Sequence, residues 1–86
     1  MKDDKLYREL SNQIEYIACC IGMFANRFSI TNQEAYRYLL EFGGLSFLYE
    51  FYDVEHTFPI DDAIDDITKI TQRNGGALYD WIVSWI

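Results

Sequence analysis

The stretch TNQEAYRYLLEFGG, residues 31–44, contains the signals for the start, the body and the end of one helix. Thr31 and Glu34 form a capping box, in which the hydroxyl and the carboxylate each accept a hydrogen bond from a free backbone N–H. Apolar residues then recur every three or four positions and predict an inward stripe of Ala35, Tyr38, Leu39 and Phe42. Gly43 and Gly44 supply the left-handed backbone conformation that ends helices. The stretch therefore predicts a short amphipathic helix, and it indicates a helical fold.

Segments on both sides of this stretch repeat the helical spacing. The first apolar series predicts one long helix and consists of Leu6, Leu10, Ile14, Ile17, Ile21, Phe24 and Phe28. Gly22 inside that helix predicts the close approach of a neighbouring helix. A third, short helix is expected over residues 45–52, and Pro59 opens a fourth that ends at Asn74-Gly75-Gly76. The fold class is all-α: a small compact bundle of four helices plus a short C-terminal fifth helix.

The last ten residues, ALYDWIVSWI at 77–86, fit either a helix or a strand. A helix is favoured, because nothing else in the chain offers a strand to pair with. On a helix, the apolar face spans about 200°, which is wider than a surface helix buries against its own domain. Self-association or a protein partner is expected to cover the partner-binding residues Tyr79, Trp81, Ile82, Val83, Trp85 and Ile86. We therefore expect a homo-oligomer.

The length, composition and charge of the chain favour a single folded domain and argue against some kinds of partner. With 86 residues the chain is expected to form a single domain over 1–86, and its 50% hydrophobic content indicates that it folds. The formal net charge of −7 argues against binding to nucleic acid or to an anionic membrane surface. The start MKDDKLYREL has no apolar signal-peptide core, so a cytoplasmic location is expected. Cys19 and Cys20 are expected to be reduced and buried.

The sharpest chemical motif is PIDDAIDDITKI, residues 59–70. Its aspartates have the D-D-x-x-D-D spacing by which some enzymes hold Mg²⁺ against a diphosphate, and these weak metal candidates are Asp61, Asp62, Asp65 and Asp66. On a helix the four carboxylates share one face, opposite an isoleucine-rich face. Such sites work as pairs of motifs around a large apolar pocket, whereas this chain has one copy. A solvated helix face is therefore the favoured interpretation, with no cofactor.

Other residues are weighed for catalysis and for DNA reading. His56 could act as a general base, but no nucleophile partners it in the sequence, so a hydrogen-bonded histidine that holds a connecting loop is favoured.

Residues 31–52 resemble a helix-turn-helix in layout. The second helix, LSFLYEFY, contains Glu50 and no side chain suited to bases or phosphates. No catalytic residue is assigned, and the protein is expected not to be an enzyme.

Several elements together resemble a family of short bacterial proteins that are catalogued as a domain of unknown function. The resemblance spans about residues 12–75 and rests on Ser29-Ile30-Thr31, Ala35-Tyr36 with Leu39-Leu40, Phe42-Gly43 before Leu45, YEFYDVEHT at 49–57 and Ile64-Asp65-Asp66-Ile67. It implies a small helical fold without an assigned activity, often encoded beside proteins resembling ADP-ribosyltransferase toxins. Gly44 and the Trp-bearing segment 77–86 depart from the family pattern, so the role of that segment has least support.

These observations favour a non-catalytic protein-interaction or regulatory module. The resemblance alone implies an accessory or antitoxin-like partner of a toxin-like enzyme. Two alternatives stay open at this point: a metal-dependent, phosphate-handling enzyme that uses the acidic helix face, and a DNA-binding regulator.

Overall fold

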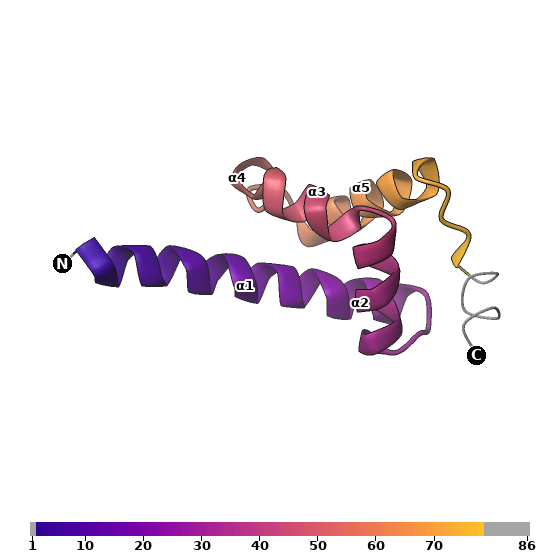
Figure 1. The fold of residues 1–86 in the computed structure, drawn as a ribbon, viewed down its shortest axis with the longest axis horizontal. Helices are drawn as coiled ribbons and strands as arrows, with labels where there is room; N and C mark the ends of the chain where they lie inside the picture. The colour runs from indigo at the N-terminus through magenta and orange to yellow at the C-terminus, as the bar shows by residue number, and fades with distance from the viewer. Residues whose placement is uncertain (1, 79–86) are drawn as a thin grey trace.

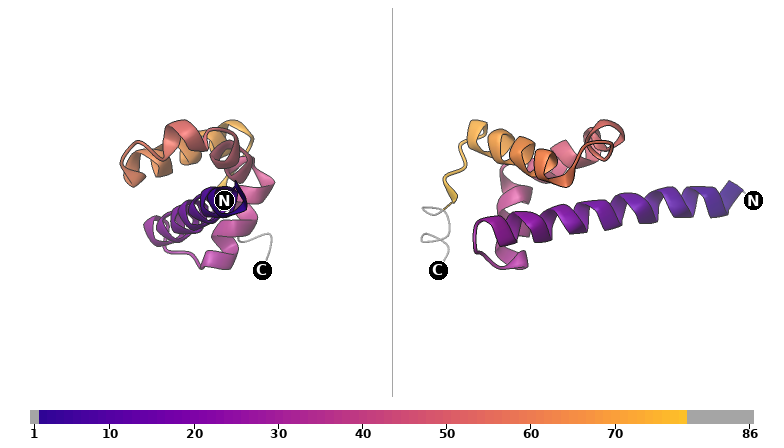
Figure 2. Two further views of the ribbon diagram at one scale, coloured as in Figure 1. Left: turned by 90° about the vertical axis from the view of Figure 1, so that its left-hand side faces the viewer. Right: turned by 180° about the vertical axis from the view of Figure 1, so that it is seen from behind.

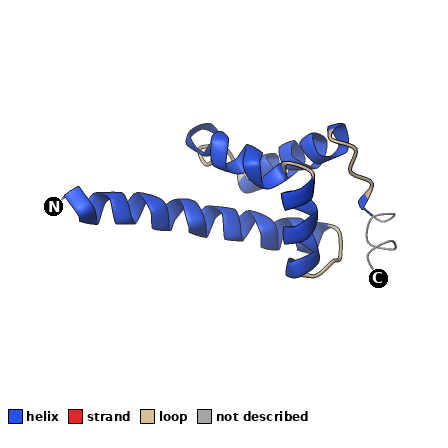
Figure 3. Cartoon of the chain, in the orientation of Figure 1, coloured by secondary structure: helices blue, strands red, loops and turns tan. Residues whose placement is uncertain are grey.

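The computed structural model describes residues 2–78 as a sequence of helices joined by short turns (Figure 1). They are α1 (Lys2–Arg27), α2 (Asn32–Glu41), α3 (Gly44–Glu50), α4 (Tyr52–Glu55) and α5 (Ile60–Arg73). The described part of the chain contains helices, turns and loops and no strand (Figure 3). The predicted all-α fold class is confirmed, and so is the order of the first four predicted helices, to which the single-turn helix α4 is added. The predicted C-terminal helix falls mostly on residues 79–86, which lie outside the described residues.

Local signals place the ends of α2 where the sequence predicts them. Thr31 caps the helix: its Oγ1 accepts a hydrogen bond from the Glu34 backbone N–H at 3.1 Å, and its own N–H donates to Glu34 Oε1 at 2.8 Å. Gly43 follows α2 with φ of 81°, a left-handed conformation that suits glycine. The chain therefore leaves α2 through a tight turn and enters α3 at once.

Gly44 allows α3 to lie close to its neighbours. A Cβ atom at this position would lie 2.7 Å from Leu39 Cδ2 and 3.1 Å from Thr71 Cγ2. Leu39 belongs to α2 and Thr71 to α5, so the missing side chain is what lets three helices meet here. Close packing at the glycine thus links elements that are far apart in the sequence.

The hydrophobic core lies between the second half of α1 and the other helices. It consists of Ile17, Cys20, Phe24, Ala25, Ala35, Tyr38, Leu39, Leu45, Leu48, Ala63, Ile64 and Ile67. Phe24 and Tyr38 stack with ring centroids 5.8 Å apart and join α1 to α2. The sequence pattern predicts the inward faces of α2 and α5 correctly, because helical periodicity alone separates their apolar and polar sides. At the third helix the same spacing predicts that Leu45, Leu48 and Phe51 face inward; Leu45 and Leu48 are buried, but Phe51 is exposed.

Two expectations for α1 are wrong. A Cβ atom added to Gly22 would meet no other atom within 4 Å, so this glycine does not mark the approach of another helix. Cys20 is fully buried, as expected, but Cys19 is exposed, since it lies about 100° further around the helix. Around Cys19, Cys20 and Gly22, the core therefore covers only one side of α1.

The largest departure concerns the length of α1 that the core covers. The molecule measures 49 × 22 × 19 Å, and the first half of α1 projects beyond the other helices (Figures 1 and 2). Leu6, Leu10 and Ile14 are predicted to face a core, yet each is more than half exposed. The reason is that α2 to α5 fold back only onto the second half of α1.

Candidate functional site

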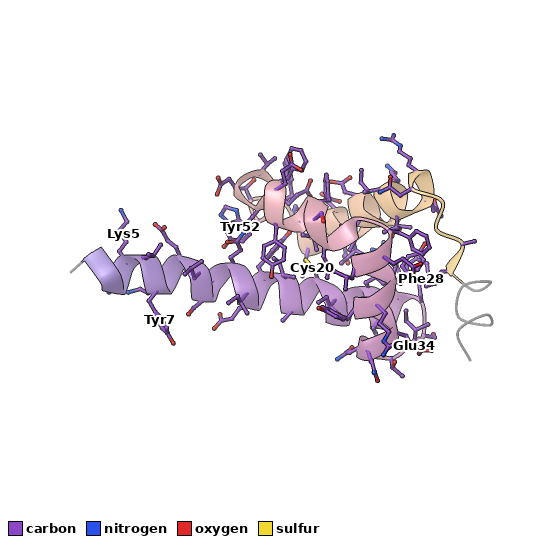
Figure 4. All side chains as sticks on the ribbon, in the orientation of Figure 1. Lys5, Tyr7, Cys20, Phe28, Glu34 and Tyr52 are labelled. Atoms are coloured by element: carbon purple, nitrogen blue, oxygen red, sulfur yellow. The ribbon has the colours of Figure 1, made fainter. Side chains whose placement is uncertain are left out.

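The projecting part of α1, residues 5–15, is called the stalk below. One side of it carries an apolar strip, the exposed stripe, formed by Leu6, Tyr7, Leu10 and Ile14, with exposed fractions of 58%, 73%, 51% and 60%. Tyr7 points away from the other helices, as Figure 4 shows. A continuous apolar strip on the surface of a protein marks an interaction site more often than scattered apolar residues do. The stalk is therefore the leading candidate for a binding surface.

The stalk meets the remaining helices at Gln13. Its Nε2 donates a hydrogen bond to the backbone oxygen of Tyr49 in α3 at 3.4 Å. A notch of about 410 Å³ opens beside this contact and is lined by Glu9, Asn12, Gln13, Tyr52, Asp53 and His56. The lining is polar, and around α1 it lies next to the exposed stripe, on the flank where Leu6 and Gln13 stand.

His56 lies at the edge of this notch and is held in place by Tyr52. Its Nδ1 donates to the Tyr52 backbone oxygen at 2.6 Å, and the two rings stack with centroids 4.5 Å apart. Thr57 closes the same turn by donating from Oγ1 to the Val54 oxygen at 2.6 Å. The predicted hydrogen bond of His56 is present, but it lies at the end of the helix α4, where a connecting loop was expected.

The aspartates of α5 do not converge on one point. Arg27 of α1 pairs with Asp65 at 2.6 Å and lies 3.7 Å from an Asp61 carboxylate oxygen. Asp61, Asp62 and Asp65 are exposed, as predicted for a solvated face, whereas Asp66 is half-buried and turns toward α4. Among the described side chains, residues 5–78, no three His, Cys, Asp or Glu side chains gather closely enough to hold a metal ion. The aspartates of α5 therefore contact two different helices: Asp65 pairs with Arg27 of α1, and Asp66 lies beside Glu55 of α4.

Asp66 meets the buried side chain of Glu55, which is only 5% exposed. Glu55 Oε2 is buried without a hydrogen-bond partner. Burial raises the pKa of Glu55 to about 7, and the neighbouring carboxyl groups of Asp66 and Asp62 add to the shift. Below that pKa the buried Glu55 side chain is therefore mostly protonated and uncharged.

Tyr16 and Cys20 of α1 complete this buried region. The Tyr16 hydroxyl lies against the Cys20 thiol and has no nitrogen or oxygen partner, and its ring meets Tyr52 edge-on at 5.4 Å. Burial raises the pKa of Tyr16 above its usual range and that of Cys20 to about 11. A thiol that stays protonated is a poor nucleophile. The arrangement therefore gives Cys20 a packing role.

The predicted partner-binding residues at positions 79–86 lie outside the described residues. The chain is described as far as Leu78, which borders an apolar cavity of about 150 Å³. Phe24, Phe28 and Tyr38 form the wall of this cavity. The expectation for Tyr79, Trp81, Ile82, Val83, Trp85 and Ile86 stays a prediction.

Sequence reasoning missed two features of the site. Glu55 stands in a segment expected to be a loop, and no periodic pattern indicates that it is buried. The exposed stripe has the right pattern for an inward face, but the pattern does not tell whether the chain is long enough to cover it. Both features depend on how far α3 and α4 reach along α1.

None of the helices in residues 2–78 has the length and hydropathy needed to cross a membrane.

Comparisons with known proteins place the chain in a family. No curated protein and no solved structure matches the chain significantly. A family model described as "Protein of unknown function (DUF3791)" matches residues 15–74. Because this match covers more than half of the chain and falls within the predicted span of 12–75, the protein belongs to that family.

Proposed function

We propose that the protein is a non-catalytic interaction module that binds another protein chain through the stalk. The observation that carries this proposal is the exposed stripe on α1, where four large apolar residues share one side of a helix that other described elements leave uncovered. Apolar anchors of this kind, arranged at helical spacing, are the feature that helix-binding partners use.

The low stability of a helix that packs against nothing supports the proposal. Isolated helices shorter than about 12–15 residues are marginal in water, because the backbone entropy of helix formation is not offset by packing. The stalk has no such packing from α2 to α5 along its exposed stripe. A partner that buries Leu10 and Ile14 would supply the missing apolar contacts and would stabilise the helix.

A more specific proposal concerns the biological setting. The family resemblance supports a bacterial protein that acts as an accessory or antitoxin-like partner of an ADP-ribosyltransferase-like protein encoded beside it. A cytoplasmic location is part of the same proposal. On this proposal the chain regulates its neighbour by contact and has no reaction of its own.

Coexpression tests the proposed function. The tagged full chain is coexpressed with the protein encoded beside it, and the complex is isolated with wild type, Leu10→Lys and Asn12→Lys. We expect Leu10→Lys to abolish the complex, because it places a charge in the apolar stripe, and Asn12→Lys to retain it, because this exposed residue lies on another side of α1. Equal recovery with all three chains would exclude the stalk as the binding surface.

A further inference from the structure

We propose that the stalk pairs with the stalk of a second copy of the chain, as an antiparallel two-helix coiled coil with Leu10 of one copy against Ile14 of the other. This inference rests on the proposed function, because it names the partner of the same exposed stripe.

The exposed stripe is the open end of a seam that runs along the whole of α1. Alternating steps of three and four residues place the seam at Tyr7, Leu10, Ile14, Ile17, Ile21, Phe24 and Phe28. This is the a and d pattern of a coiled coil, in which side chains of one helix insert between those of another. From Ile17 onward the chain's own core covers most of the seam, whereas Tyr7, Leu10 and Ile14 are exposed. The open part thus retains the spacing that fits another helix.

The positions that flank the open seam are uncharged. Leu6 and Gln13 lie on one side of it, and Ser11 and Ala18 lie on the other. Flanks that carry charges of one sign repel an identical antiparallel helix, because each flank then faces its own copy, whereas neutral flanks allow a helix to pair with its own copy. The charged side chains of the stalk stand away from the seam and are Lys5, Arg8, Glu9 and Glu15.

The distribution of charge favours the antiparallel arrangement. The stalk, residues 5–15, holds two basic and two acidic residues, whereas residues 16–86 hold four basic and ten acidic residues. Antiparallel stalks keep the two acidic bodies at opposite ends of the contact, and parallel stalks would place them side by side. The near-balanced stalk is therefore the part of the chain that a second copy approaches with least repulsion.

The seam also sets the register. In an antiparallel coiled coil, an a position of one helix faces a d position of the other. Leu10 is a d position and Ile14 is an a position, so each faces the other across the two-fold axis. This register centres the contact on the two Leu10–Ile14 layers, which lie on the uncovered part of α1. The next layer sets Tyr7 of one copy beside Ile17 of the other, at the point where the chain's own core begins to cover the seam.

The oligomeric state of the full chain provides the first part of the test. Sedimentation equilibrium is measured for wild type, Leu10→Lys, Ile14→Glu and the control Asn12→Lys, with circular dichroism to follow helix content. We expect wild type and Asn12→Lys to dimerise and the two seam variants to be monomers. Leu10 and Ile14 are about half exposed, so neither change disturbs the core. A monomeric wild type at submillimolar concentration overturns the proposal.

Mixing the two seam variants tests the register. In the antiparallel register, a mixed dimer of Leu10→Lys with Ile14→Glu forms one Lys–Glu contact and one Leu–Ile contact. We expect dimers to return in the equimolar mixture. A parallel pair would face Lys with Leu and Ile with Glu, so a mixture that stays monomeric overturns the antiparallel pairing.

The coexpression experiment separates this inference from the proposed function. A chain that is monomeric alone, yet forms a complex that Leu10→Lys abolishes, overturns the second-copy proposal and leaves the interaction module in place. A chain that is monomeric and forms no stalk-dependent complex overturns both.

Discussion

The carboxyl group of Glu55 in α4 lies beside that of Asp66 in α5, so two acidic side chains from different helices meet where one of them is almost fully buried. Asp62 of α5 adds negative charge to the same region, and Tyr16 and Cys20 of α1 border it without a basic group. Glu55 carries no buried, unpaired charge as long as it keeps its proton.

The first prediction is a loss of stability as the pH rises through this pair. The pKa of Glu55 is raised from an ordinary 4.5 to about 7 in the folded protein, so the native state holds a proton that the unfolded chain releases. The free energy of unfolding should therefore fall from about pH 4.5 to about pH 7 and show no further change from this group above that range. Urea titrations at a series of pH values measure it.

Two variants isolate the origin of that slope. Glu55→Gln removes the titrating group, so the free energy of unfolding should no longer fall between about pH 4.5 and about pH 7. Asp66→Asn removes a negative charge beside Glu55, so this fall should end at a lower pH. Asp65→Asn is the matched control, because Asp65 faces Arg27 instead of Glu55. A slope that survives Glu55→Gln unchanged would assign it to another group.

The second prediction assigns opposite effects to two glycines. Gly22→Ala should raise the free energy of unfolding by about 0.5–1 kcal/mol, because alanine favours a helix and nothing lies within 4 Å of the new Cβ. Gly44→Ala should lower it by about 1–3 kcal/mol, because the new Cβ overlaps the buried Leu39 side chain. Thermal unfolding of the two single variants gives the signs. A stabilised Gly44→Ala would contradict the packing described at α3.

The third prediction concerns the cap of α2. Thr31→Ala should lower the free energy of unfolding by about 0.5–2 kcal/mol, since the Glu34 N–H loses its hydrogen bond. Thr31→Ser keeps the hydroxyl and should be nearly neutral. Chemical denaturation compares the two, and equal losses would show that the methyl group, and not the cap, matters at this position.

The fourth prediction concerns the acidic face of α5. Asp65→Asn should change the free energy of unfolding by no more than about 1 kcal/mol, because the Arg27–Asp65 ion pair is partly exposed. Calorimetry with Mg²⁺ or Mn²⁺ should show no binding tighter than millimolar, since the aspartates are divided between Arg27 and Glu55. Micromolar affinity that disappears in Asp65→Asn would restore the metal interpretation.

The amino-acid sequence by itself determined the features that depend on neighbouring residues. The capping box of Thr31 and Glu34, the turn at Gly43 and the two faces of α5 follow from backbone hydrogen bonds and helical periodicity, which act within a few residues. The His56 turn belongs to the same class, because its hydrogen bond reaches back only to Tyr52.

Only the tertiary structure decided which part of the long α1 seam is covered. Leu10 and Phe24 have the same place in the heptad pattern, yet Leu10 is half exposed and Phe24 is buried, because α2 to α5 fold back over one half of the helix. The burial of Glu55, the role of Gly44 and the open surroundings of Gly22 were decided in the same way. These features arise from contacts between residues far apart in the chain, and local periodicity carries no information about how far such contacts extend.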